Sequence, residues 1–157
     1  MKKPNKERTA EEVYDDLVSQ GAYEEASIDA DEIEKIKRTT IEDYEYGQRL
    51  KTGDQPNWRV IFNIHYDALR ELCGLLMRFK KQKTSNHQGL FAFIILQFPE
   101  LNLDWAFFET IRTMRNQNKY LGTDITQEKW QKIEFQTMLY ISTLKKEIER
   151  LIKTAEY

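Results

Sequence analysis

The chain has 157 residues, enough for one ordinary domain with its own hydrophobic core. Hydrophobic residues make up 40% of the sequence and charged residues 32%, which favours a compact soluble fold over a disordered chain. No apolar run approaches the roughly 20 residues of a membrane span, and no apolar stretch follows the basic first residues, so neither a membrane protein nor a signal peptide is expected. The single cysteine, Cys73, cannot form an internal disulfide, and the expected location is the reducing cytoplasm.

The formal net charge of −2 is distributed unevenly along the chain. Residues 7–45 hold 14 acidic against 4 basic residues, a net charge of −10, whereas residues 46–157 hold 12 acidic against 17 basic residues, a net charge of +5. A basic body is compatible with an anionic partner such as RNA, because phosphate contacts depend on local charge. On composition alone, acidic residues that merely solvate exposed helices are the stronger explanation of this asymmetry.

The first two predicted helices begin with capping patterns. Thr9–Glu12 has the spacing of a capping box and predicts a short helix that ends at Gly21. A second capping pattern begins at Asp29, and apolar residues then recur at helical spacing to about Lys51, so this helix should end at Gly53.

Four further helices are predicted from apolar residues spaced three and four apart. The first of them carries the longest apolar stripe and is expected to be the central core helix. Their expected starts are Asp54–Pro56, Ser85 or Asn86, Asn102, and Asp124 or Thr126. No segment alternates with period two, so the sequence predicts an all-α protein. We expect an antiparallel bundle of four to five helices over residues 28–157, preceded by an acidic arm with a short helix over residues 1–27.

Metal and cofactor chemistry has no support in the residue pattern. His65, His87 and Cys73 do not stand at ligand spacing from one another, and the sequence has no glycine-rich phosphate loop. We therefore expect neither a metal nor another cofactor.

One polar group of residues stands out near the end of the predicted helix over residues 103–120. Arg115 lies four residues after Ile111 and seven after Phe108, so it continues the apolar stripe, and Asn118 does the same four residues after Met114. Polar groups at such positions must be paired or reach a ligand. From spacing alone, an arginine that caps the helix or pairs with an acid on a neighbouring helix is favoured over one that binds a ligand.

The order of these segments resembles a HEPN domain (higher eukaryotes and prokaryotes nucleotide-binding superfamily) over about residues 28–155. The segments that carry the resemblance are Tyr66–Leu72 leading into Lys83–Leu90, then Ile111–Asn116 followed by Tyr120 and Gly122, and last a closing helix that begins near Ile125–Glu128.

HEPN domains resemble four- to five-helix bundles that pair as homodimers, with the arginine and histidine of an Arg-x(4–6)-His signature lining a cleft at the interface. Many are metal-independent ribonucleases, often toxins partnered with a nucleotidyltransferase antitoxin, and others bind nucleotides without cleaving. The resemblance makes Arg115, Asn116 and Tyr120 the candidate catalytic residues. Tyr120 occupies the position of the signature histidine.

This replacement bears on the chemistry. Cleavage of RNA without a metal needs a base near neutral pH, which histidine supplies with a pKa near ~6.5 and tyrosine, near ~10, does not. The remaining candidates for binding an anion or RNA are Arg112, Arg115, Asn118, Lys119 and His87. We therefore expect a homodimer that binds RNA or a nucleotide in a toxin–antitoxin or defence-type system, without efficient ribonuclease activity. An aromatic cluster, Trp105, Phe107 and Phe108, is expected to supply apolar surface for the dimer.

Two alternatives remain open. The first is an active, metal-independent endoribonuclease toxin in which another residue, with His87 as the first candidate, replaces the missing base. The second is a non-catalytic protein–protein interaction module whose acidic residues 7–45 dock a basic partner.

Overall fold

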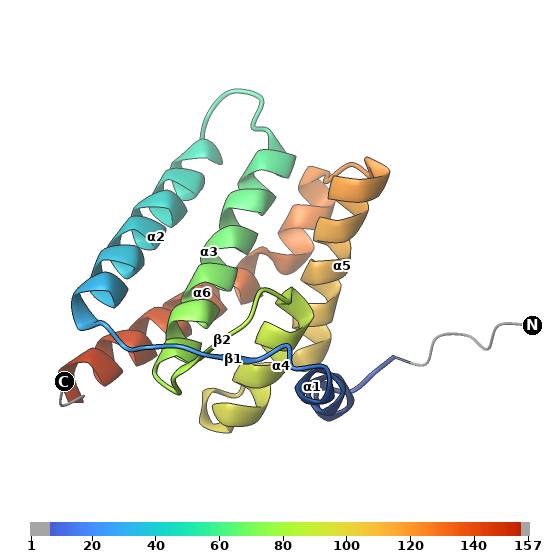
Figure 1. Cartoon of the computed structure of the whole chain (residues 1–157). Helices are drawn as coiled ribbons and strands as arrows, with labels where there is room; N and C mark the ends of the chain where they lie inside the picture. Colours follow the sequence, from blue (N-terminus) through green and yellow to red (C-terminus); the bar gives the residue numbers. More distant parts are fainter. Residues whose placement is uncertain (1–6, 155–157) are drawn as a thin grey trace, which may run out of the picture.

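The computed structural model describes residues 7–154, so the first six residues of the predicted arm and the last three of the predicted bundle lie outside it. The described chain is an α-helical bundle, as predicted (Figure 1). Its elements are α1 (Ala10–Ser19), β1 (Glu24–Glu25), α2 (Ala30–Leu50), α3 (Trp58–Arg78), β2 (Gln82–Lys83), α4 (His87–Gln97), the 3₁₀ turn η1 (Pro99–Leu101), α5 (Trp105–Leu121) and α6 (Gln127–Thr154).

Helix α3 is the central element, because it packs against α2, α4, α5 and α6. Figure 1 shows α3 between α2 and α5, with α2 and α3 running in opposite directions. Leu69, Leu72 and Leu76 of its apolar stripe are fully buried in the main core. Burying one such leucine contributes about 2 kcal/mol. Within residues 7–154, no helix has both the length and the apolar character needed to cross a membrane.

Local capping explains why several helices begin where the sequence predicts. The Thr9 hydroxyl accepts a hydrogen bond from the Glu12 N–H at 3.1 Å, and the Asn86 side-chain oxygen Oδ1 accepts one from the Gly89 N–H at 2.8 Å. Thr126, rather than Asp124, caps α6 through a 3.2 Å bond from the Lys129 N–H. Each such cap satisfies a backbone donor that the helix leaves unpaired.

Two predicted helix starts are wrong and lie too early. Helix α3 is capped by Asn57, after Pro56, and not within Asp54–Pro56. Helix α5 is capped by Asp104, because Asn102 instead ends η1 in the left-handed conformation, with a φ of 53°. In both places an irregular turn occupies residues that resemble a helix start.

A pair of two-residue strands was not predicted. β1 and β2 pair in antiparallel register, with Glu24 opposite Lys83 and Glu25 opposite Gln82. The Ala26 N–H donates a further bond to the Lys81 carbonyl oxygen at 2.9 Å. This pairing ties the segment between α1 and α2 to the turn that follows α3.

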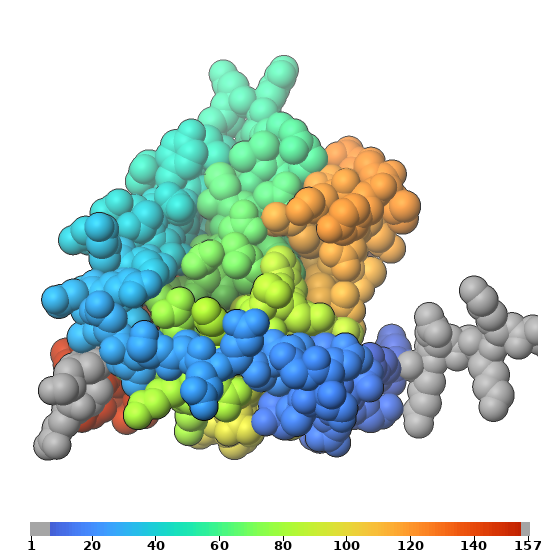
Figure 2. Space-filling model, viewed as in Figure 1, coloured from blue at the N-terminus to red at the C-terminus, as the bar shows by residue number. Residues whose placement is uncertain are grey.

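The acidic arm packs on the bundle through α1. Val13 and Leu17 of α1 are buried with Ala92 of α4 in a small second core. The Trp105 indole N–H donates to the Arg8 carbonyl oxygen at 2.9 Å, and the Tyr23 hydroxyl donates to the Gly89 carbonyl oxygen at 2.7 Å. In the space-filling view, this blue segment runs across the lower part of the bundle (Figure 2).

Candidate functional site

Most of the residues singled out from the sequence line one hollow of about 400 Å³, formed by the start of α4 and the second half of α5. Positions 112, 115, 116 and 119 fall on one face of α5 because they follow helical spacing. The capped start of α4 contributes the opposite wall. The lining residues of this hollow, called here the basic hollow, are Ser85, Asn86, His87, Gln88, Arg112, Arg115, Asn116, Lys119 and Tyr120.

Asn118 does not line the basic hollow. Its side-chain amide donates a 2.9 Å hydrogen bond to the Thr123 carbonyl oxygen. This bond holds the turn that follows α5, where Gly122 adopts a φ of 66°. The structure therefore gives Asn118 a helix-ending contact in place of the expected ligand-facing position.

Arg115 lines the hollow and is also held by α3. Its Nη1 donates to Asp67 Oδ1 at 3.0 Å and to Asn63 Oδ1 at 3.4 Å, and its Cζ lies 5.1 Å from the centre of the Tyr66 ring. The Arg115 side chain is 19% exposed and that of Asp67 is 47% exposed. This is the inter-helix ion pair that spacing alone favoured. Among the described residues, only Nη1 of the guanidinium is engaged in a hydrogen bond.

The charge of Arg112 is offset by Glu109, one turn earlier on α5. Arg112 Nε and Nη2 donate to the two Glu109 carboxylate oxygens at 3.0 and 2.8 Å. Gln88 of α4 donates to the same carboxylate at 3.2 Å, so Glu109 joins α4 to α5. Sequence reasoning did not single out Gln88, Glu109 or Asp67. Gln88 and Asp67 do lie within two of the segments that carry the HEPN resemblance.

Lys119 and Tyr120 stand at the open rim. The Lys119 ammonium lies 5.7 Å from the centre of the Tyr120 ring, and Lys119 forms no ion pair within residues 7–154. Tyr120 is 72% exposed and the neighbouring Leu121 is 76% exposed. The position that the HEPN resemblance assigns to the signature histidine is therefore an accessible one at the edge of the hollow.

His87 opens α4 and is bonded to the core. Its Nδ1 lies 3.1 Å from the hydroxyl of buried Tyr66, whose pKa burial raises to about 12. The protonated Tyr66 phenol is able to donate this bond to Nδ1, and in that tautomer the His87 proton lies on Nε2. Burial, followed by the charges of Arg70 and Arg115, lowers the pKa of His87. At neutral pH this side chain is therefore an uncharged N–H donor.

The other titratable candidates are structural. His65 is fully buried, with both ring nitrogens hydrogen-bonded. Cys73 is also buried, and burial raises the pKa of its thiol, so it is a poor nucleophile at neutral pH. Within residues 7–154, no three His, Cys, Asp or Glu side chains gather as metal ligands.

The aromatic cluster does not supply the dimer surface expected of it. Phe107 and Phe108 are buried in the main core, and Trp105 is partly buried against it. Phe108 stacks on Phe91 of α4, with ring centres 4.6 Å apart. The large apolar side chains left exposed at the end of α5 are Tyr120 and Leu121.

Comparisons with protein-family models, curated proteins and solved structures give no significant match to this chain. The HEPN resemblance therefore rests on the sequence segments quoted above.

Proposed function

We propose that this protein is a divergent HEPN-like bundle that binds RNA or a nucleotide through the basic hollow, as a component of a toxin–antitoxin or defence-type system. The observation that carries the proposal is the gathering of Arg112, Arg115, Asn116 and Lys119 of α5 with His87 of α4 in one hollow. These residues come from two segments of the chain, and both belong to the HEPN resemblance.

The donors of the hollow suit a phosphate. Arg115 keeps Nε and Nη2 for a ligand while Nη1 holds Asp67, Lys119 carries an unpaired charge within the described residues, and neutral His87 offers Nε2–H. Charge-assisted bonds from such groups to phosphate oxygens are stronger than neutral ones. The dipole of α4, whose first turn lines the hollow, adds to the attraction.

Binding without efficient cleavage is the form of this function that the residues favour. Tyr120 replaces the histidine base, and His87 has its Nδ1 lone pair occupied by the Tyr66 hydroxyl. A ring in that tautomer donates a hydrogen bond and does not accept the 2′-hydroxyl proton. The ribonuclease alternative requires the other tautomer of His87, the one histidine in the hollow, with Nδ1–H donating to the Tyr66 hydroxyl and Nε2 free to act as the base.

The proposed assembly is a homodimer through the end of α5. Tyr120 and Leu121 support it, because they expose apolar surface beside the basic hollow, so a second copy would bring two hollows together. A nucleotidyltransferase-type antitoxin as a further partner rests on the HEPN resemblance alone.

The test is a titration of fluorescently labelled single-stranded RNA at several salt concentrations. We expect affinity to fall as salt rises, and Lys119→Gln to weaken binding and reduce the slope of log K against log salt by about 0.7. The matched control is Lys146→Gln, which removes the same charge from an exposed site on α6 outside the hollow. Absence of RNA binding at low salt, or an equal loss in both variants, would overturn the proposal.

A second variant, Asp67→Asn, tests the same proposal in the opposite direction. It retains an oxygen acceptor for Arg115 but removes the competing negative charge, so RNA affinity should rise while the fold persists. The ion pair is partly exposed, so its loss should reduce the free energy of unfolding by no more than about 1 kcal/mol.

A further inference from the structure

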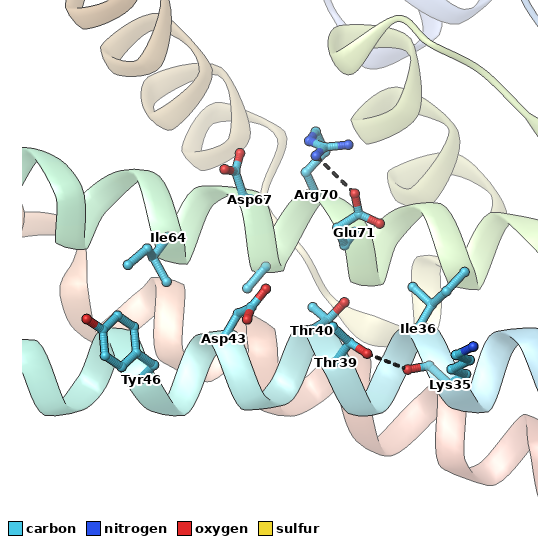
Figure 3. A pocket seen from close by; sticks show the side chains of 11 residues that line it. Lys35, Ile36, Thr39, Thr40, Asp43, Tyr46, Ile64, Asp67, Arg70 and Glu71 are labelled. Carbon is cyan, nitrogen blue, oxygen red and sulfur yellow. Dashed lines mark hydrogen bonds and ion pairs between the residues drawn. The ribbon is translucent and has the colours of Figure 1, made fainter.

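A second, larger hollow lies between α2 and α3 (Figure 3). Its volume of about 670 Å³ falls within the range of roughly 300–1,000 Å³ that is typical of small-ligand sites. Apolar side chains of both helices form part of its lining, with polar and charged groups around them. The residues that line this α2–α3 groove are Lys35, Ile36, Thr39, Thr40, Asp43, Tyr46, Ile64, Asp67, Ala68, Arg70 and Glu71.

The groove differs from the basic hollow in charge. Its two cations, Lys35 and Arg70, are outnumbered by the carboxylates of Asp43, Asp67 and Glu71, and Arg70 already pairs with Glu71 at 3.0 Å. A phosphate gains little there. The mixture of apolar surface and hydrogen-bonding groups instead suits an uncharged, polar ring.

One ion pair links residues of the two hollows. Asp67 lines the α2–α3 groove, and its Oδ1 lies 3.0 Å from Nη1 of Arg115, which lines the basic hollow. In Figure 3, the Asp67 carboxylate stands on the side of α3 turned away from α2. A ligand that crosses this pair reaches a cationic site at one end and a mixed apolar and polar site at the other.

We propose that the α2–α3 groove is a nucleoside subsite, and that a ribonucleotide binds with its phosphate in the basic hollow and its base in the groove. This proposal rests on the proposed function for the position of the phosphate. Ile64 and Ala68 offer an apolar floor for the base, and the Asp43 carboxylate accepts hydrogen bonds from base N–H groups. An RNA chain would use the groove for one base at a time.

Tyr46 is the aromatic platform of this subsite. Its ring is 52% exposed and belongs to the lining, and Arg49 lies over the ring with Cζ 5.7 Å from its centre. A base stacks on the ring face that Arg49 leaves open. Stacking of a base on an aromatic side chain contributes about 1–3 kcal/mol, so its loss is measurable as a change in affinity.

The experiment compares inorganic phosphate with the four ribonucleoside 5′-monophosphates by calorimetric titration. At least one nucleotide should bind about tenfold more tightly than phosphate, because only the nucleotide reaches the groove. Tyr46→Ala and, independently, Asp43→Asn should weaken that nucleotide and leave phosphate binding unchanged. The control is Phe135→Ala, which removes an aromatic ring that is even more exposed, at 79%, from α6 and should change neither affinity.

The outcomes separate this proposal from the proposed function. If phosphate and all four nucleotides bind equally, and Tyr46→Ala and Asp43→Asn change nothing, the nucleoside subsite is wrong while the phosphate site stands. If neither phosphate nor any nucleotide binds, both proposals fail. If Phe135→Ala weakens the nucleotide as much as Tyr46→Ala does, the base lies elsewhere and the subsite is wrong.

Discussion

At the scale of single residues, His65 is a buried titratable group whose two ring nitrogens both have hydrogen-bond partners. Its Nδ1–H donates to the Ile61 carbonyl oxygen at 2.7 Å, and its Nε2 accepts a hydrogen bond from the Gln48 amide. Its ring lies 4.5 Å from that of Trp130, so contacts from α2, α3 and α6 meet at this side chain. The neutral ring satisfies both partners, and a second ring proton would face the Gln48 amide.

We predict that stability falls as the pH drops from about 6.5 to 4, because of His65. Burial, the largest cause, lowers the pKa of His65 to about 4, whereas an unfolded histidine titrates near 6.5. Below 6.5 the unfolded state therefore binds a proton that the folded state does not. The resulting loss of unfolding free energy approaches about 3 kcal/mol at pH 4. Urea unfolding at several pH values measures it.

The control for this prediction is His65→Asn, which keeps a donor near the Ile61 carbonyl but cannot titrate. This variant should be less stable at pH 7. Above pH 4, its unfolding free energy should depend on pH much less than that of the natural chain. Part of the slope should persist, since burial also lowers the pKa of His87. A slope equal to that of the natural chain would show that His65 is not its source.

The lining of the basic hollow was accessible to sequence reasoning to a limited degree. Arg112, Arg115 and Lys119 could be grouped because helical spacing alone puts them on one face. The partners Asp67 and Glu109 were not identified, because the acid that an arginine reaches depends on how two helices pack. For the same reason spacing misjudged Asn118, whose side chain bonds to a turn that spacing does not describe.

At the scale of elements, the contact between α1 and α4 depends on the absence of a side chain. A Cβ added at Gly89 would lie 2.5 Å from Leu17 Cδ1 and 3.2 Å from the Tyr23 hydroxyl oxygen. Leu17 is itself buried in the small core beneath α1, so it has little room to move. An alanine at this position would therefore force the Leu17 side chain, which belongs to the contact between α1 and α4, to shift.

We predict that Gly89→Ala loosens α1 and lowers the free energy of unfolding by about 1–3 kcal/mol, the usual cost of overpacking. Limited proteolysis should then cut the chain around residues 20–29 faster. The matched control is Gly74→Ala in α3, where nothing lies within 4 Å of the added Cβ. That change should instead stabilise the protein by about 0.5–1 kcal/mol, because alanine favours a helix interior. Equal effects of the two variants would contradict the prediction.

The existence of each helix was predictable from local sequence patterns, whereas some helix boundaries were not. Apolar spacing and the caps at Thr9 and Asn86 are properties of a few consecutive residues, so they could be recognised without a structure. The start of α3 was misplaced because Gln55 adopts a φ of 50° and turns the chain before the helix. The β1–β2 pair was missed because two residues cannot display a period of two.

At the scale of the whole molecule, the exposed end of α5 is the surface on which the proposed assembly depends. We predict a homodimer by light scattering, and a monomer for Leu121→Glu, because a carboxylate at an apolar contact is costly to bury. Phe135→Glu introduces the same charge at an exposed apolar residue of α6 and should leave the dimer intact. If the natural chain is a monomer, the proposed homodimer is wrong. If only Phe135→Glu dissociates the dimer, the interface lies on α6 and not at the end of α5.

The β1–β2 pairing has a consequence for the order in which the chain acquires its structure. Glu24 of β1 pairs with Lys83 of β2, and α1 packs on α4, so α1 and β1 find their partners only after the later segment through α4 has left the ribosome. Until then the apolar side of α1 is uncovered, and a nascent helix of this length is marginal in water. The arm should therefore join late, closing over a hairpin of α2 and α3 that has formed without it. Truncated nascent chains that stop before residue 87 should be open to proteases in the arm yet already protected in that hairpin.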